Sequence, residues 1–359
     1  MEEFDVYAID KQADVEHVKC PTCGGNMEFD PTTQNLSCPF CGNKEVFTKD
    51  KAVKELDVAD AFQKAQKWDE ASVLVCDNCG ARVIITTKDV ATECPYCGTT
   101  HVRESDQLAG IKPNAVYPFT CTYQEAEALA KKWAKRRIFA PRRFKKNIEA
   151  KNLRGVYEPC FTFDSRTSSR YDGRLGKRKT RTVRTKNGTR TETYIEWRHV
   201  SGTIDYFFDD IHISAGSGIE QKVLDRLLPF RADTIAVYDN EYLAGFTAKH
   251  YEKGLDTAWG EAKSDMDQAI RRLIMEKHDC DVCGSLNVST HHNDVKYKYL
   301  LMPVYNLNYN YKKKSYRVNV NGNTGKVVGK TPVSFWRVLI AVVLGLAVAA
   351  GVAYLFLNA

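Results

Sequence analysis

Several signatures of common protein classes are absent from this sequence. No H-E-x-x-H motif occurs, and this motif marks many zinc metalloproteases, so the sequence does not predict a protease of that class. The first ten residues, MEEFDVYAID, are acidic and contain no apolar run, so we expect no secretory signal peptide. The run GKVVGKT, residues 325–331, has three residues where a phosphate-binding loop needs four, and Pro332 follows it. We therefore interpret NGNTGK as a turn and expect no nucleotide binding.

Acidic residues are scarce in one part of the chain. Between Lys131 and Arg190 there are 21 lysines or arginines and only 4 acidic residues. The formal charge of the whole chain is +7, so the other 299 residues sum to −10. A basic segment in an otherwise mildly acidic protein usually has an anionic partner. Nucleic acid, lipid headgroups, a protein partner and a merely solvated strand face remain as alternatives for residues 131–190.

The bulk composition is that of a globular protein with an unusual number of thiols. Of 359 residues, 43% are hydrophobic and 27% are charged. This length allows two or three domains at about 100–200 residues each. Twelve cysteines, arranged mostly as C-x-x-C pairs in an unexported chain, indicate reduced thiolates that hold metal rather than disulfides.

Eight of the cysteines form two matched quartets. Both quartets read C-x2-C-x14-C-x2-C, and the second repeats the first after 56 residues. The pentapeptides CPFCG and CPYCG belong to the two copies. The predicted metal ligands are Cys20, Cys23, Cys38 and Cys41 in the first quartet and Cys76, Cys79, Cys94 and Cys97 in the second.

The chemistry of metal binding explains this spacing. A C-x-x-C knuckle turns tightly enough for both sulfurs to reach one ion, and the glycine after each second cysteine suits that turn. The residues between the knuckles, such as MEFDPTTQNLS, have the pattern of a β-hairpin. Two knuckles joined by a hairpin form a zinc ribbon, with four protein ligands and no open position. We therefore predict two structural Zn²⁺ ions, with iron as the alternative metal.

Another cysteine pair has a weaker pattern. Cys280 and Cys283 form a lone knuckle, and a third metal site with His291 or His292 would have a C-x2-C-x7-H spacing that is short for a ribbon. We favour a pair that is free or shared with another subunit.

Residues with catalytic potential are also few. Asp209, Asp210 and His212 could bind a hard metal or serve a hydrolase, although surface residues are the favoured interpretation. Cys121 and Cys160 have no histidine partner at a motif spacing. Because no catalytic constellation is complete, we predict that the protein is not an enzyme.

Hydrophobic periodicity predicts both helices and strands. Amphipathic helices are expected over residues 50–71, over TYQEAEALAKKWAKRRIF with a capping box at Thr122 and Glu125, and over GIEQKVLDRLLPF and LDTAWGEAKSDMDQAIRRLIMEKH. Asn187-Gly188 between alternating residues predicts a β-hairpin, and residues 295–328 have a strand, turn, strand pattern. Helices and strands are grouped rather than strictly alternating, which predicts an α+β domain with mainly antiparallel pairing.

The segment VLIAVVLGLAVAAGVAYLFL, residues 338–357, contains twenty residues without a charge. At 1.5 Å per residue it would span about 30 Å, the thickness of a bilayer's hydrocarbon core. Lys326, Lys330 and Arg337 precede it and no cation follows, so the positive-inside rule places the body in the cytoplasm. We expect a tail-anchored, single-pass protein of the inner membrane.

The predicted organisation follows from these patterns. It comprises a zinc ribbon at 1–48, a helical connector at 49–71, a second zinc ribbon at 72–105, the α+β domain at 106–330, a juxtamembrane linker at 331–337 and a transmembrane helix at 338–357.

These features together resemble a known family. With the paired ribbons, the stretches VYEPCFTFD, EYLAGFTAKHYE and KYKYLLMPVYNLNYNYKKKSYRVNVNGNTGKVVGKTP are similar to bacterial membrane-associated proteins described as "TFIIB-type zinc ribbon-containing". Some relatives have names taken from the primosomal replication-restart helicase, but this chain lacks the phosphate loop that such an enzyme requires. Cys160, where the family commonly has an aromatic residue, and the knuckle at 280–283 depart from the family pattern.

The leading hypothesis is a non-enzymatic, tail-anchored adaptor that faces the cytoplasm and uses its ribbons to bind a protein partner. The alternative is a membrane-tethered protein that binds nucleic acid through the ribbons and residues 131–190. Phosphate contacts would then make the affinity fall steeply with salt.

Overall fold

The computed structural model describes residues 18–46, 53–63, 67–68, 72–76, 82–85, 102–105, 108–109, 111–142, 144, 153–185, 188–311 and 314–357.

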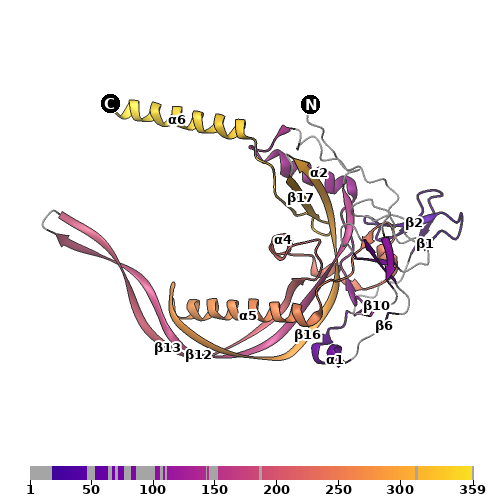
Figure 1. Ribbon diagram of the computed structural model, residues 1–359, viewed down its shortest axis with the longest axis horizontal. Helices are drawn as coiled ribbons and strands as arrows, with labels where there is room; N and C mark the ends of the chain where they lie inside the picture. The colour runs from indigo at the N-terminus through magenta and orange to yellow at the C-terminus, as the bar shows by residue number, and fades with distance from the viewer. Residues whose placement is uncertain are drawn as a thin grey trace.

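Three long strands form the centre of the fold (Figure 1). They are β12 (Arg154–Thr185), β13 (Gly188–Ser214) and β16 (Val282–Tyr311), with 32, 27 and 30 residues. β12 lies between the other two and pairs antiparallel with both. Its pairing with β13 continues to Thr185 and Gly188, as the predicted hairpin requires. Its pairing with β16 ends at Gly176, so residues 177–185 and 188–196 form a two-stranded arm.

The exposure of β12 changes along its length. From residue 155 to residue 165 every residue is buried, so both faces of the sheet are covered there. From residue 166 onward burial alternates: Thr167, Ser169, Tyr171 and Leu175 are at most 3% exposed, whereas Arg166, Ser168, Arg170, Asp172 and Arg174 are exposed. Successive side chains of a strand point to opposite faces, so only one face remains covered.

α5 (Leu255–Lys277) covers that face. Its buried residues recur every three or four positions, which places them on one side of the helix. They are Leu255, Ala258, Ala262, Met266, Ile270 and Ile274. The helix contacts β12, β13 and β16, and Figure 1 shows it in the concave side of the curved strands. The amphipathic helix predicted here is confirmed.

Short strands widen the sheet to nine strands near the start of β12 and the end of β16, which we call the inner end of the sheet. These are β5 (Leu56–Asp57), β11 (Ala115–Val116), β14 (Ala236–Val237), β15 (Thr247–Ala248), β17 (Lys314–Asn321) and β18 (Val327–Gly329). The turn between β17 and β18 contains Gly325, whose φ of 73° suits glycine and whose N–H donates to the carbonyl of Asn321. The sequence NGNTGK is therefore a turn, as predicted.

Further helices flank this inner end. They are α2 (Tyr123–Lys135), α4 (Gln221–Leu227) and the 3₁₀ turns η2 (Ala232–Thr234) and η3 (Asn240–Leu243). The predicted capping box of α2 is present, because Thr122 Oγ1 accepts from the N–H of Glu125 while the Glu125 carboxylate accepts from the N–H of Thr122. α4 covers a second apolar cluster that contains Leu224, Leu227 and Leu300.

Three smaller sheets are formed by strands that lie before β11 in the sequence. β1 (Val18–Lys19), β2 (Asn26–Asp30), β3 (Asn35–Ser37) and β4 (Lys44–Glu45) form the first. β7 (Ser72–Cys76), β8 (Arg82–Ile85) and β9 (Val102–Ser105) form the second. β6 (Lys67–Trp68) and β10 (Leu108–Ala109) form the third.

The connector between the ribbons differs from its prediction. Instead of one helix over residues 50–71, the described part contains α1 (Val58–Gln63) between the short strands β5 and β6. β5 pairs with Lys296 and Tyr297 on the edge of β16. Its pairing satisfies backbone groups at that edge, and this tertiary contact overrides the helical pattern.

α6 (Phe335–Leu357) follows the sheet. Its first turn is held to the loop after α2, because Arg337 Nη1 donates to the carbonyls of Ile138 (2.9 Å) and Ala140 (2.8 Å). The side chains of residues 352, 353 and 355–359 lie outside the described part of the chain. Among the described residues, no helix is long and apolar enough to cross a membrane, and the span predicted over 338–357 is not supported.

The mixed α+β architecture with mainly antiparallel pairing is confirmed, as is a cysteine cluster near the N-terminus.

Candidate metal centre

The first cysteine quartet lies at one end of the sheet β1-β2-β3-β4, and we call residues 18–46 ribbon 1. Cys20 and Cys23 belong to the turn from β1 to β2, and Cys38 and Cys41 to the turn from β3 to β4. β2 and β3 pair antiparallel between these turns, as the predicted hairpin requires. Because the hairpin folds the chain back on itself, both knuckles reach the same end of the sheet.

The two knuckles have the same backbone hydrogen bonds. In the first, the N–H of Cys20 donates to the carbonyl of Gly25 (2.7 Å) and the N–H of Gly24 donates to the carbonyl of Cys20 (2.9 Å). In the second, the N–H of Cys38 donates to the carbonyl of Asn43 (2.8 Å), and the N–H of Gly42 donates to the carbonyl of Cys38 (2.9 Å). Gly24 and Gly42 have φ values of 71° and 74°, a region that strains residues with a side chain.

The four sulfur atoms converge. All ligand atoms of the quartet lie within 4.8 Å of one another, with 3.6 Å between the sulfurs of Cys20 and Cys41 and 3.5 Å between those of Cys23 and Cys38. Four thiolates at the Zn–S distance of about 2.3 Å in a tetrahedron would be about 3.8 Å apart. The quartet can therefore hold one metal ion. Asn43 Nδ2 also donates to the sulfur of Cys20 (3.8 Å), a contact that orients a ligand.

The electrostatics of the site favour a cation. Desolvation raises the pKa of Cys20, but hydrogen bonds from the backbone of Cys23 and Thr22 and from neighbouring thiols outweigh it and lower the pKa to about 6. At Cys41 the N–H of Asn43 lowers the pKa, yet the neighbouring sulfurs and desolvation raise it to about 12. Four sulfurs at these distances do not all ionise unless a cation balances their charge.

Ribbon 1 is docked on the main sheet domain. The N–H of Phe29 donates to the carbonyl of Ala244 beside η3 (2.8 Å), and its ring lies 5.4 Å from that of Tyr242. On the next turn, Gln34 Nε2 donates to the carbonyl of Phe119 (2.7 Å). The short-range cysteine pattern gave no signal for these contacts, because their partners lie 85 or more residues away in the sequence.

Only part of the second quartet lies within the described residues. Cys76 ends β7, which pairs with β8 and β9. Cys79, Cys94 and Cys97 lie outside the described residues, so the second site stays a prediction.

A second group of possible ligands gathers around a lysine. Carboxylate oxygens of Asp164, Asp209 and Asp210 lie within 4.8 Å of one another. Lys298 Nζ lies 2.7 Å from Asp210 Oδ1, 3.6 Å from Asp164 Oδ2 and 3.1 Å from Glu55 Oε1. The ammonium group thus occupies the place that a cation would take, and this arrangement is an ion-pair cluster.

The protonation of this cluster is set by burial and by Lys298. Burial raises the pKa of Asp164 to about 6, although Lys298 and the N–H of Asp210 (2.6 Å from Asp164 Oδ1) oppose that shift. Burial lowers the pKa of Lys298, but the carboxylates around it have the larger effect and raise it. Lys298 and Asp164 are only 8% and 3% exposed, so this charge balance is internal to the sheet.

His212 lies beside this cluster without joining it. Its Nδ1 donates to the carbonyl of Asp210 (2.6 Å), and burial lowers its pKa, so the ring stays neutral. Sequence reasoning named Asp209, Asp210 and His212 but missed Asp164, Glu55 and Lys298, since no local spacing connects these positions.

The other weak candidates do not come together. His291 and His292 are adjacent in a strand and point to opposite faces, and His292 contacts Ser165 Oγ (3.3 Å). Cys283 is eight residues from His291 along β16, about 26 Å in an extended strand. These residues form no metal cluster in the described part of the chain. Burial raises the pKa of both Cys160 and Cys121.

The comparisons with known proteins give one informative relative. No protein-family model matches the chain, and no solved structure matches it. The chain is 31% identical over 328 residues to the "Uncharacterized protein YdjG" of Bacillus subtilis (strain 168), a match that covers 89% of this chain and 91% of that protein. The chain therefore belongs to the same family as YdjG.

Proposed function

We propose that this protein is a zinc-binding, membrane-attached interaction protein without catalytic activity, and that it is one of the TFIIB-type zinc ribbon-containing proteins. The convergence of four sulfurs in ribbon 1 carries the proposal. Thiolates are soft ligands that suit zinc, and four protein ligands leave no position for substrate. The second quartet would hold a second ion, because its spacing repeats that of the first.

The role of ribbon 1 would be to present a rigid contact surface to a protein partner. Its hairpin is fixed on the sheet domain, while the tip of its second knuckle faces solvent. At that tip Phe40 is 76% exposed, and its ring packs over Gly25 of the first knuckle, where a Cβ would lie 2.6 Å from it. An exposed aromatic side chain on a preorganised loop is a typical anchor of a protein interface.

Membrane attachment is supported by the uncharged residues 338–357 and by Lys326, Lys330 and Arg337 before them, which favour a cytoplasmic body. Phe335 and Trp336 are both 70% exposed at the start of α6, where aromatic residues suit a membrane interface.

Metal analysis of the full chain, purified in detergent, tests the zinc proposal. Wild type is expected to contain two zinc ions per chain, and Cys20→Ser/Cys38→Ser and Cys76→Ser/Cys94→Ser one each. Cys280→Ser/Cys283→Ser is the matched control, because it removes a C-x-x-C pair outside both quartets and should leave two. Iron, or no metal, in the wild type would refute the proposal, and a lower content in the control than in the wild type would show that Cys280 and Cys283 bind metal.

Extraction of native membranes with alkaline carbonate tests the attachment. The full chain is expected to stay in the pellet, and Leu344→Arg should shift a fraction of it to the supernatant, because an arginine at the centre of a span costs about 2.5–3.5 kcal/mol. Release of the unmodified chain would refute membrane insertion while leaving the zinc proposal intact.

A further inference from the structure

The face of the long sheet that α5 leaves uncovered has a composition of its own. Because paired residues share a face, it contains the even positions 166–178 of β12, the odd positions 195–207 of β13 and the odd positions 285–293 of β16. We call this the outer face. Figure 1 shows that it is the convex side of the curved strands and that it lies on the side away from α6.

Four arginines follow one another along the middle strand of the outer face. Arg166, Arg170, Arg174 and Arg178 are exposed and lie four residues apart, which is about 13 Å in an extended strand. Arg166 lies 3.5 Å from Asp294. None of the other three takes part in an ion pair within the described ranges.

The opposite face of the arm, which we call the inner face, has cations with acidic partners. Lys179 lies 2.7 Å from Glu196, and Arg181 lies 3.4 Å from Glu192. On β12, these inner-face cations therefore have acidic partners, whereas Arg170, Arg174 and Arg178 of the outer face form no ion pair among the described residues.

Trp197 forms a flat platform on the outer face. Gly176 of β12 and Gly284 at a bulge of β16 make room for it, since a Cβ would lie 3.0 Å from the ring at Gly176 and 2.6 Å from it at Gly284. One side of the ring thus lies against the backbone, and 37% of the residue is exposed. The Arg174 guanidinium is 5.2 Å from the ring centroid.

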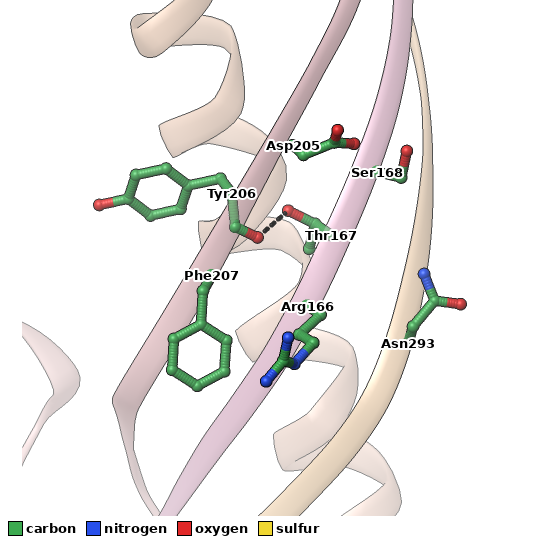
Figure 2. A pocket seen from close by; sticks show the side chains of 7 residues that line it. All are labelled: Arg166, Thr167, Ser168, Asp205, Tyr206, Phe207 and Asn293. Carbon is green, nitrogen blue, oxygen red and sulfur yellow. Dashed lines mark hydrogen bonds between the residues drawn. The ribbon is translucent and has the colours of Figure 1, made fainter.

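A second aromatic residue lies at the other end of the outer face. Figure 2 shows Phe207 beside Arg166, whose guanidinium carbon is 5.7 Å from the ring centroid, and Phe207 is 54% exposed. The two residues line a shallow cavity of about 360 Å³. Of the other lining residues, Ser168, Asp205 and Asn293 belong to the outer face and offer hydroxyl, carboxylate and amide groups. Thr167 and Tyr206 belong to the opposite face, where the Thr167 hydroxyl donates to the Tyr206 carbonyl.

We infer that the outer face binds single-stranded nucleic acid. Arginines contact phosphates, and aromatic rings stack on bases of any sequence. Trp197 and Phe207 are ten residues apart on β13, about 33 Å, with the arginine row beside them. Exposed polar residues of β16, such as Asn287, Ser289 and His291, can hydrogen-bond base edges or a ribose 2′-hydroxyl.

An anionic bilayer fits the outer face less well. Figure 1 shows a convex face turned away from α6, so a flat surface reached by α6 would not follow it. Asp172, 3.2 Å from His199, and Asp205 also lie on this face and would repel a dense layer of headgroups, whereas a carboxylate can accept from the amino group of a base. The inferred partner depends neither on zinc nor on membrane insertion.

Fluorescence anisotropy with the zinc-loaded full chain in phosphatidylcholine nanodiscs tests this inference. The probes are labelled oligo(dT) and oligo(U) of about twelve nucleotides, a length within the usual site sizes, and vesicles with phosphatidylglycerol are the competitor. Arg170→Ala/Arg178→Ala removes two charges from the outer face. Lys179→Ala/Arg181→Ala, the matched control, removes two charges from the inner face of the same strand.

Binding to one or both oligonucleotides at low salt is expected, and a preference for oligo(U) would indicate contacts with the 2′-hydroxyl. The outer-face variant should bind at least about tenfold more weakly, with a slope of log K against log salt that is smaller by about 1.4, which is two phosphate contacts. Trp197→Ala should also weaken binding by about tenfold, and Trp197→Phe should restore most of it. The absence of binding at low salt, equal losses in both double variants, or displacement by anionic vesicles alone would overturn the inference.

Discussion

Ribbon 1 and the Lys298 cluster both gather acidic or thiol groups at short distances, and they differ in the source of the cation. In ribbon 1 four sulfurs lie within 4.8 Å, and none of the residues that the structure describes forms an ion pair with them. In the sheet, carboxylates of Asp164, Asp210 and Glu55 surround the ammonium group of Lys298. The first arrangement could hold an ion from solution, whereas the second already contains its cation in the folded chain.

This difference has a structural cause. Ribbon 1 buries few apolar residues of its own, namely Met27, Phe29 and Leu36, so we expect the proposed metal to supply much of its folding free energy. The sheet domain buries a large apolar core that includes the buried side of α5, and we expect this core to form without an ion. Removing the metal ion should therefore unfold only ribbon 1. Removing the charge of Lys298 should instead lower the stability of the whole sheet domain.

Metal removal is expected to have the largest effect. Chelation should unfold ribbon 1, because structural zinc contributes on the order of 10 kcal/mol or more to such a module. Amide hydrogen exchange should show loss of protection over residues 18–46 and retained protection in β12, β16 and α5. Protection of residues 18–46 that survives complete metal removal would show that docking on the sheet domain is sufficient to fold the ribbon.

Replacing Lys298 is expected to have the second largest effect. Lys298→Met leaves Asp164, Asp210 and Glu55 without their cation, and breaking a buried ion pair in this way costs about 3–5 kcal/mol. Lys296→Met is the control, because Lys296 is half exposed and 3.9 Å from Glu55, and should change stability by less than about 1 kcal/mol. Equal effects of the two variants in chemical denaturation would contradict the internal charge balance.

The pH dependence of this variant sharpens the test. The pKa of Asp164 is raised from 3.8 to about 6, so the native state binds more protons than the unfolded state between these values and stability falls as pH rises through them. Without Lys298 the pKa rises further, because the lysine was lowering it. The destabilisation by Lys298→Met should therefore be smaller at pH 5 than at pH 7.5.

Local patterns predicted what depends on local geometry. The spacing from Cys20 to Cys41 predicted the converging sulfurs of ribbon 1, since each knuckle is a short turn and the hairpin between them is a short-range structure. The capping box at Thr122 and the hairpin before Gly188 were predicted for the same reason. Each of these features is determined by residues that are close in the sequence.

Features that depend on distant residues were not predictable in this way. Lys298 and Glu55 are 243 residues apart, and only the pairing of β5 with β16 brings them together. The basic segment at 131–190 is continuous in sequence, yet the structure divides its described residues between α2 and the long hairpin. Within the hairpin, one face of β12 carries the ion-paired Lys179 and Arg181, and their acidic partners belong to β13. The separation of these cations from the arginines of the outer face therefore depends on how β12 and β13 pair.

Truncating the core under α5 provides a comparison in which no cation takes part. Met266 is fully buried between the helix and the strands, so Met266→Ala should destabilise the sheet domain by about 2–5 kcal/mol through lost contacts and a cavity. Met266→Leu keeps the volume and should cost less than about 1.5 kcal/mol. The effect should not change between pH 5 and pH 7.5, in contrast to that of Lys298→Met. A similar pH dependence of both variants would show that the charge cluster does not titrate as described.

The capping box of α2 should give the smallest of these effects. Thr122→Ala removes the hydroxyl that accepts from the N–H of Glu125 and should cost about 1 kcal/mol, whereas Thr122→Ser keeps an acceptor and should cost less. Because α2 contacts β17 and β18, this loss should appear in the unfolding of the sheet domain and leave the zinc content of ribbon 1 unchanged. If Thr122→Ala also lowers the zinc content, ribbon 1 and the sheet domain fold as one cooperative unit. The hydrogen bond from Gln34 to the carbonyl of Phe119, three residues before the Thr122 cap of α2, would then be the contact that joins them.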